Sequence, residues 1–184
     1  MYLTMSVVST SDTVPLNKIR LAIVGTMCSG KTFAVDRLIE RLGDLQLDIS
    51  CQRISLRSVL QNEFGHDGIL THETAHILRR NHVIQKLCEQ IIEERDVVIV
   101  EDVRYNEEIE YLKERGFKIA LIETPWHIRL ERLQKNYKNP VELIGKIQWI
   151  SHTSELDMGR LDGFDYVAES VLVNNFVEKI INSI

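Results

Sequence analysis

Cysteine is scarce in this sequence, and positive charge is not in excess. The 184 residues include three cysteines, Cys28, Cys51 and Cys88, an odd number without any C-x-x-C spacing. Cysteines of this kind are typical of free thiols in a reducing compartment, so we expect a cytoplasmic protein. The formal net charge of −5 argues against a broad nucleic-acid-binding surface, because such surfaces neutralise phosphates with Lys and Arg.

Long apolar runs and two familiar motifs are also missing. No run approaches the roughly 18 apolar residues of a membrane span, and the N-terminus lacks the charged-then-apolar layout of a secretion signal. We therefore expect neither a membrane nor a nucleic acid as partner. The chain also lacks a G-x-S-x-G nucleophile elbow and a G-x-G-x-x-G dinucleotide fingerprint, which argues against the enzyme classes that use them.

Length and composition predict one compact domain. Hydrophobic residues make up 44% of the sequence and charged residues 27%, which is ordinary for a globular protein. Residues 1–17 are rich in Ser and Thr and show no sustained periodicity. We therefore expect a flexible N-terminal leader over residues 1–17, followed by a single domain over residues 18–184.

The most informative segment is the loop that follows the first apolar run. That run, residues 21–24, ends at Gly25, and G-x-x-x-x-G-K-T is then completed by Gly30, Lys31 and Thr32. Glycines let backbone N–H groups approach an anion, and the helix that follows adds the positive end of its dipole. In such a loop the lysine reaches the β- and γ-phosphates, and the threonine hydroxyl holds Mg²⁺. We expect ATP and Mg²⁺ as cofactors, with the nucleotide contacting Gly25, Thr26, Met27, Cys28, Ser29, Gly30, Lys31 and Thr32.

Strand-like and helix-like segments alternate along the chain. Strands are predicted over residues 19–24, 45–51, 97–100 and 117–122, with a fifth at either 166–169 or 171–173. Helices are predicted from the loop to residue 42, over residues 55–63, 71–94, 106–115, 124–136 and 141–150, and from the last strand to residue 184. This alternation predicts an α/β fold. We expect a three-layer P-loop NTPase sandwich, with about five parallel strands, helices on both faces and a small lid.

Two residues at the end of the third strand are candidates for the chemistry. Ligands in open α/β sheets bind beyond the carboxyl ends of the strands, and Asp102 follows residues 97–100. Asp102 could hold Mg²⁺ against Thr32, directly or through water, although a one-residue change of register would put Glu101 there instead. Arg104 points to the same rim, where a guanidinium can stabilise the charge that develops in phosphoryl transfer.

Arginines elsewhere fall into two groups. Arg129 and Arg132 share one helix face and lead into a polar loop, which predicts a basic lid over residues 129–141 that closes on the nucleotide. The second group lies between the second and third strands, in a region over residues 53–82 that could hold an acceptor substrate. Its members are Arg57, Arg79 and Arg80.

The motifs together resemble those of the P-loop nucleoside monophosphate kinases. The resemblance covers most of residues 19–184 and rests on GTMCSGKT at 25–32, on EDVRYNEEIEYLKERGFKIALIET at 101–124, and on HTSE at 152–155 with a later V-x-N-N. The D-V-R-x-N-E pattern of residues 102–107 is most similar to that of phage-type deoxynucleoside monophosphate kinases. Dephospho-CoA kinases and a group of archaeal adenylate-kinase-like proteins share much of this layout.

The resemblance implies ATP-dependent phosphoryl transfer to a nucleoside or deoxynucleoside monophosphate. It gives Lys31, Asp102, Arg104, Arg129 and Arg132 catalytic roles, with Thr32 and Asp102 on the metal. It also implies that Asn174 or Asn175 lies on the adenine side and that Arg104 and Glu107 face the acceptor. A kinase for another small acceptor, such as dephospho-CoA, and a non-kinase regulatory NTPase remain as alternatives. We expect a small-molecule nucleotide as the ligand and a monomer or homodimer as the assembly.

Overall fold

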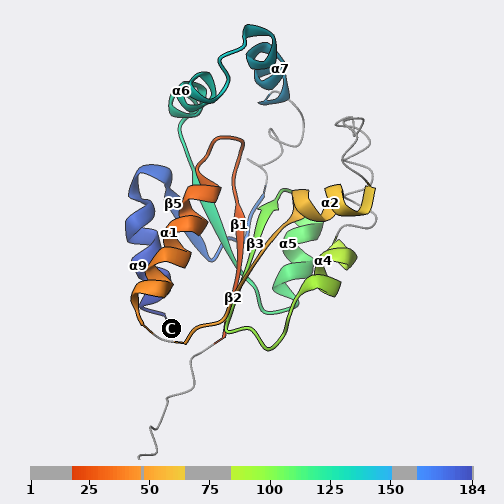
Figure 1. Cartoon of the computed structure of the whole chain (residues 1–184), viewed down its shortest axis with the longest axis vertical. Helices are drawn as coiled ribbons and strands as arrows, with labels where there is room; N and C mark the ends of the chain where they lie inside the picture. The colour runs from red at the N-terminus through yellow and green to blue at the C-terminus, as the bar shows by residue number, and fades with distance from the viewer. Residues whose placement is uncertain (1–17, 47, 65–83, 151–160, 184) are drawn as a thin grey trace, which may run out of the picture.

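A parallel β-sheet forms the centre of the molecule (Figure 1). The computed structural model describes residues 18–46, 48–64, 84–150 and 161–183. The sheet has five strands in the order β2-β3-β1-β4-β5, and every neighbouring pair is parallel. The strands are β1 (Ile19–Val24), β2 (Cys51–Ser55), β3 (Val97–Val103), β4 (Lys118–Glu123) and β5 (Tyr166–Glu169). The predicted α/β class with a five-stranded parallel sheet is confirmed.

Helices cover both faces of the sheet, which gives the predicted three layers (Figure 1). One face packs against α1 (Lys31–Asp44) and α9 (Val173–Ile181), which follows the short 3-10 helix η3 (Ser170–Leu172). The opposite face packs against α2 (Leu56–Phe64), α4 (Ile84–Gln90) and α5 (Asn106–Lys113). Each face has its own cluster of buried apolar side chains, as expected when a parallel sheet is covered on both sides.

Strand β1 is apolar at almost every position, and the packing on its two faces explains why. Leu21 and Ile23 belong to the cluster under α1 and α9, whereas Ala22 and Val24 belong to the cluster on the opposite face. Successive side chains of a strand point to opposite faces, so a strand with both faces covered needs apolar residues at every position. This central strand leads directly into the glycine-containing loop.

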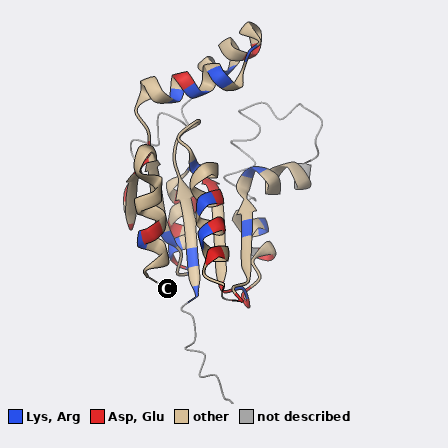
Figure 2. Ribbon diagram, turned by 60° about the vertical axis from the view of Figure 1, so that its left-hand side comes forward, with Lys and Arg blue, Asp and Glu red and all other residues tan. Residues whose placement is uncertain are grey.

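Two helices lie beyond the carboxyl end of the sheet (Figure 1). They are α6 (Trp126–Asn136) and α7 (Pro140–Ile150), and the predicted lid over residues 129–141 spans the end of α6, the connection and the start of α7. Figure 2 shows that most charged residues lie on helices and loops, with several Lys and Arg on these two helices. In the part of the chain that the structure describes, no helix is both long enough and apolar enough to cross a membrane.

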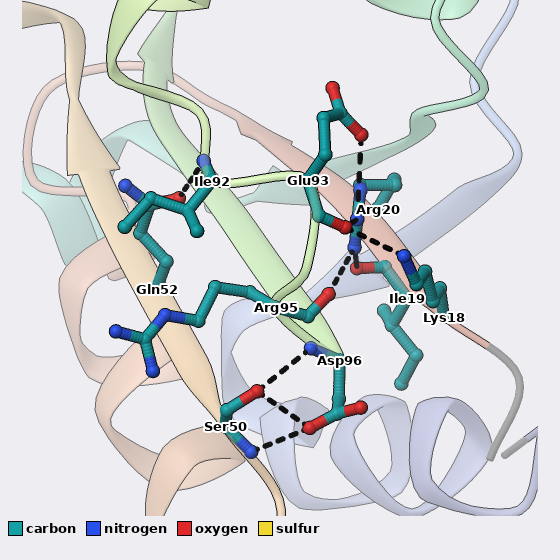
Figure 3. Close-up of polar contacts among 9 residues, drawn as sticks. All are labelled: Lys18, Ile19, Arg20, Ser50, Gln52, Ile92, Glu93, Arg95 and Asp96. Carbon is teal, nitrogen blue, oxygen red and sulfur yellow. Dashed lines mark hydrogen bonds and ion pairs between the residues drawn. The ribbon is translucent and has the colours of Figure 1, made fainter. Parts of the chain in front are cut away.

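A hydrogen-bond network ties the amino ends of three strands together (Figure 3). The carboxylate of Asp96, just before β3, accepts hydrogen bonds from the backbone N–H of Ser50 at 2.8 Å and from its hydroxyl at 2.6 Å. The backbone of Ile19 donates to the Asp96 carbonyl at 2.8 Å. Nearby, the guanidinium of Arg20 donates to the carbonyls of Arg95 and Glu93. These contacts hold the end of the sheet opposite the loop.

Two predicted elements were wrong in their bounds. The second strand is Cys51–Ser55, not residues 45–51, because α1 continues to Asp44 and Gln46 adopts a positive φ of 53°. The predicted helix over residues 71–94 ends at Gln90. Residues 71–83 of that prediction, the leader over residues 1–17 and the HTSE run lie outside the described residues.

Candidate functional site

A cavity of about 750 Å³ opens at the carboxyl end of the sheet, over the glycine-containing loop. We refer to it as the loop cavity. The lining residues come from the loop, from α1 and α2, from the end of β3, and from α6 and η3. They are Met27, Cys28, Ser29, Gly30, Lys31, Thr32, Phe33, Asp36, Arg57, Asp102, Arg104, Arg132, Lys135, Asn136 and Ser170. Five of these side chains are basic and two are acidic, so the loop cavity favours an anionic ligand.

The loop has the backbone conformation that its glycines allow. Gly30 has a φ of 97° and forms the N-cap of α1. Cys28 also has a positive φ, of 60°, and the backbone N–H of Ser29 donates to the carbonyl of Thr26 at 3.1 Å. Helix α1 is 14 residues long, has no acidic residue in its first turn and receives no side-chain cap at Gly30. The positive end of its dipole therefore faces the loop cavity.

Lys31 lies inside the loop. Its side chain is largely buried, and its ammonium donates hydrogen bonds to the carbonyls of Gly25 at 2.6 Å and Thr26 at 2.8 Å. These contacts hold the charged end of Lys31 within the turn that lines the loop cavity. The predicted contact of this lysine with the phosphates remains a prediction, and the position of its ammonium at the loop is compatible with it.

Gly25 and Ser29 show how tightly the loop is built. A Cβ atom on Gly25 would lie 2.6 Å from the Ser29 hydroxyl and 2.8 Å from the carbonyl oxygen of Ile122. The Ser29 hydroxyl is buried and has no hydrogen-bond partner among the described residues. A buried polar atom of this kind costs free energy unless a ligand or water satisfies it. This orphaned hydroxyl, the adjacent Lys31 and the helix terminus fit the phosphates of a nucleotide.

A β-bulge at the end of β3 places Glu101, Asp102 and Val103 in different surroundings. Ile23 pairs with Glu101, but the next residue of β1, Val24, pairs with Val103, so Asp102 is the extra residue. Asp102 has a φ of 64°, a left-handed conformation that Asp tolerates better than most residues. Its side chain lines the loop cavity, whereas Glu101 is buried and forms an ion pair with Arg53.

Arg104 lies beside Asp102 in the loop cavity. Its guanidinium is 3.7 Å from the Asp102 carboxylate, and both side chains are mostly buried. Glu108, a buried residue of α5, accepts a hydrogen bond from the backbone N–H of Arg104 at 2.7 Å and from that of Tyr105 at 3.3 Å. The first turn of α5 therefore holds the backbone that carries Arg104.

Arg132 joins the predicted lid to the loop. One of its terminal nitrogens donates to the carbonyls of Cys28 and Ser29, both at 3.1 Å. The other donates to the hydroxyl of Ser170 at 3.2 Å. Arg129, the second arginine predicted for the lid, does not line the loop cavity, and its guanidinium lies 5.2 Å from the centre of the Trp126 ring. Arg129 and Arg132 thus share one helix, but only Arg132 of the two lines the loop cavity.

The predicted acceptor residues do not all lie at the loop cavity. Arg57, at the start of α2, lines the loop cavity, but Arg79 and Arg80 lie outside the described residues. Glu107 is exposed in the first turn of α5 and does not line the loop cavity. Asn174 is exposed at the start of α9, and it too is not among the lining residues.

Several residues of the loop cavity were not singled out from the sequence. Phe33 and Asp36 project from the first turns of α1, and Ser170 comes from η3. Phe33 is 57% exposed, so much of its ring is accessible from the loop cavity. Helical spacing from Thr32 indicates Asp36, one turn later, as a neighbour of the loop. Ser170 carries no comparable signal.

The loop cavity contains side-chain oxygens that could bind a metal ion. Among the described residues, no group of three or more His, Cys, Asp or Glu side chains could hold a metal ion. Thr32 and Asp102 nevertheless line one cavity with the loop, so the donor set suits a metal that arrives with the oxygens of a nucleotide. Among the described residues, Cys28 and Cys51 form no disulfide, and burial raises the pKa of Cys51.

Several solved structures share this fold. A shikimate kinase from Bacteroides thetaiotaomicron is 16% identical with a TM-score of 0.58, over 89% of this chain and 96% of that chain. A shikimate kinase from Acinetobacter baumannii in complex with shikimate is 16% identical with a TM-score of 0.56, over 91% and 96%. The Mycobacterium tuberculosis APS kinase in complex with AMPPNP and APS is 14% identical with a TM-score of 0.62, over 91% and 98%.

Sequence comparison adds the family. No curated protein matches the chain. The AAA_18 family model, described as an AAA domain, matches residues 21–148, which is more than half of the sequence. This match includes the loop, the end of β3, all of α6 and most of α7. The chain therefore belongs to this AAA domain family and has a P-loop kinase-like fold.

Proposed function

We propose that this protein transfers the γ-phosphoryl group of ATP to a nucleoside or deoxynucleoside monophosphate, giving the diphosphate and ADP. The observation that carries the proposal is the shared loop cavity. It brings the loop with Lys31 together with Asp102 and Arg104 at the end of β3 and with Arg57 in α2. Its excess of basic side chains suits two phosphorylated ligands better than one.

The donor phosphates would bind the loop and the start of α1. Lys31 already holds its ammonium within the loop, and the orphaned Ser29 hydroxyl can donate to a phosphate oxygen. Arg132, which donates to the carbonyls of Cys28 and Ser29, stands at the opposite rim of the same loop. Fixed cations around the transferred group stabilise its transition state without reorganisation during the reaction.

Thr32 and Asp102 would hold Mg²⁺. When bound there, the ion would neutralise charge on the β- and γ-phosphates and help to orient them. Thr32 would contribute its hydroxyl from the first turn of α1, and Asp102 its carboxylate from the bulge of β3. The Asp102 carboxylate also pairs with Arg104, so it contributes to the orientation of that guanidinium.

The acceptor would enter from the side of α2. An oxygen of its phosphate attacks the γ-phosphorus, and the bond from that phosphorus to the β–γ bridging oxygen breaks, so ADP leaves with the electron pair. Arg57 and Arg104 can bind the acceptor phosphate through their guanidinium forks. The exposed ring of Phe33 offers an apolar surface for a base. An ionised phosphate needs no general base, so the proposed reaction requires none.

A second candidate is a kinase for a small hydroxylated acceptor. The solved structures with this fold include proteins named shikimate kinases. A hydroxyl acceptor must lose a proton as it attacks, and the Asp102 carboxylate in the loop cavity could accept it. This candidate therefore assigns Asp102 a task that the nucleoside monophosphate reaction does not need. A third, non-kinase alternative is a regulatory NTPase, which would hydrolyse ATP without an acceptor.

A panel of acceptors tests these candidates. Purified protein, ATP and Mg²⁺ are incubated with each nucleoside and deoxynucleoside monophosphate, dephospho-CoA, shikimate or no acceptor, and ADP formation is followed. We expect ADP only with a nucleoside or deoxynucleoside monophosphate. ADP formed equally well without an acceptor would contradict the proposal, and ADP formed only with a hydroxylated acceptor would favour the second candidate.

Two variants test whether Arg104 binds the phosphate of the acceptor. Arg104→Ala should raise the KM for the acceptor more than the KM for ATP, because Arg104 is proposed to bind the acceptor phosphate. Arg115→Ala is the matched control, since Arg115 follows α5 and lies over the Tyr111 ring instead of in the loop cavity. Equal effects of the two substitutions would remove Arg104 from the acceptor site.

A further inference from the structure

One arginine bridges three elements next to the loop cavity. Arg53 lies on β2, the strand at the edge of the sheet. Its Nε donates to the carboxylate of Glu101 on β3, and its Nη1 donates to the carboxylate of Asp36 on α1 at 2.7 Å. We refer to this chain of Asp36, Arg53 and Glu101 as the arginine bridge.

The bridge follows from the pleat and the register of the strands. Arg53 pairs with Ile99, so Glu101, two residues later on β3, points to the same face of the sheet as Ile99. Ile99 packs in the cluster under α1, which places Arg53 and Glu101 on the α1 face. Glu101 is 6% exposed, and a carboxylate buried to this extent requires a charged partner. Arg53 provides it, and the hydrogen bond to Glu101 raises the pKa of Arg53, so the partner remains charged.

Both ends of the bridge adjoin the residues that would hold Mg²⁺. Asp36 follows Thr32 by four residues, which is about one helical turn along the same side of α1. Glu101 directly precedes Asp102, the extra residue of the β-bulge. Thr32 and Asp102 belong to different elements, so the separation of their oxygens depends on how α1 sits against the end of β3.

We propose that Arg53 is a positioning residue for the magnesium site, because it ties α1 to β3 one helical turn from Thr32 and one residue from Asp102. The inference rests on the proposed function for its nucleotide and metal, and it adds a residue that contacts neither. Ion pairs at both ends of one guanidinium fork fix the two carboxylates relative to each other, which a lysine ammonium cannot do as rigidly.

The left-handed backbone at the β-bulge needs support from its surroundings, and the arginine bridge supplies part of that support. Asp102 has a left-handed backbone, and such residues persist only where the surrounding structure holds them. Glu108 holds the backbone on the far side of the bulge through the N–H groups of Arg104 and Tyr105. The arginine bridge holds the near side through Glu101. Removal of the near support would let the Asp102 carboxylate move relative to α1.

Equilibrium binding of ADP, with and without Mg²⁺, tests the proposal by isothermal titration calorimetry. Partners of metal ligands typically change metal affinity by roughly 10–100-fold when removed. We therefore expect the double variant Arg53→Met with Glu101→Gln to raise the Mg²⁺ concentration needed for half-maximal enhancement of ADP binding by about tenfold or more. ADP affinity without Mg²⁺ should stay within about twofold of wild type, because the loop residues are unchanged. The double variant avoids leaving a buried charge without its partner.

Two further variants and one control keep the test decisive. Asp36→Asn cuts the bridge at its exposed end, where the Asp36 side chain is 56% exposed, and it should shift the Mg²⁺ requirement in the same direction without unfolding the protein. Arg53→Lys should lie between wild type and the double variant. Arg41→Ala is the matched control, because the Arg41 to Glu178 pair at 2.7 Å also ties α1 to another helix but lies away from the loop cavity.

The outcomes separate the proposals. An unchanged Mg²⁺ requirement in the double variant and in Asp36→Asn would overturn the positioning role, as would an equal shift in Arg41→Ala. ADP binding that does not respond to Mg²⁺ in the wild-type protein would overturn it as well. A wild-type protein that binds ADP with Mg²⁺ but phosphorylates no nucleoside monophosphate would contradict the proposed function and leave the positioning role to be judged on the shift alone.

Discussion

Replacing Gly25 with alanine should damage both the stability of the fold and the loop that it opens. The added Cβ would lie 2.6 Å from the Ser29 hydroxyl and 2.8 Å from the carbonyl oxygen of Ile122. The hydroxyl can rotate away, but the carbonyl is part of β4 and cannot move without shifting the strand. Relief of the clash would therefore displace the loop, including the Gly25 carbonyl to which Lys31 donates.

The magnitude follows from two costs. Overpacking a tight site typically costs about 1–3 kcal/mol, and a residue held in a sparsely populated φ/ψ region costs about 1–3 kcal/mol. Gly25 has a φ of 156°, which residues with a side chain rarely adopt. We expect Gly25→Ala to lower the free energy of unfolding by roughly 2–6 kcal/mol and to weaken ADP binding.

Gly43 provides the control for this prediction. It lies in α1, and a Cβ there would meet no atom within 4 Å. Gly43→Ala should raise the free energy of unfolding by about 0.5–1 kcal/mol, because alanine loses less backbone entropy in a helix. Urea unfolding followed by circular dichroism measures both variants. A Gly25→Ala protein with wild-type stability and wild-type ADP affinity would refute the reasoning about the loop.

Three further predictions address Lys31, Arg132 and Asp96. Lys31→Ala should lower kcat by roughly 10²–10³-fold, as expected for a lost charge-stabilising donor, while circular dichroism shows an intact fold; undiminished turnover would contradict the role of the loop. Arg132→Ala should lower the free energy of unfolding by about 1–3 kcal/mol, since a charged donor to the loop and Ser170 is lost, and should raise the KM for ATP; an unchanged KM would exclude Arg132 from nucleotide binding. The hydrogen bonds from Ser50 lower the pKa of Asp96, so their contribution to stability is present above the usual Asp pKa of about 3.9 and is lost as the pH falls through the lower folded-state pKa. The urea midpoints of wild type and Asp96→Asn should therefore differ at pH 6 and converge at pH 3. A difference between the two proteins that is the same at both pH values would contradict this linkage.

The parts of the fold that depend on local patterns could be predicted from the sequence. Residues 97–100 are consecutive apolar residues, and they lie in a strand with strands on both sides and helices over both faces. The glycine spacing after residues 21–24 likewise predicted the loop between β1 and α1. Each of these features follows from neighbouring residues alone.

Alternation of apolar residues led to the error in the second strand. Leu45, Ile49 and Cys51 are all partly buried against the cluster under α1, although the described residues 45–46 and 48–50 form a connection and not a strand. A connection that crosses the end of a helix can bury apolar side chains without pairing to a strand. Tertiary contacts decide this case, and the pattern alone does not distinguish the two outcomes.

The end of β3 shows why the site was harder to predict than the fold. Regular alternation leaves either Glu101 or Asp102 facing the loop, and the choice depends on register. The bulge resolves it, because Glu101 turns to Arg53, Val103 is buried and Asp102 lines the loop cavity. An extra residue in one strand depends on its pairing with another strand far away in the sequence, so local patterns give no sign of it.

Phosphorus NMR of the complete reaction mixture tests the central claim most directly. Wild-type protein, ATP and Mg²⁺ are mixed with the nucleoside monophosphate that gives the most ADP in the acceptor panel, or with all of them if none does. We predict that the γ-phosphate signal of ATP disappears while the β-phosphate signal of the acceptor diphosphate appears in equal amount. Inorganic phosphate in place of that signal, or no loss of ATP with any nucleoside monophosphate, would contradict the account.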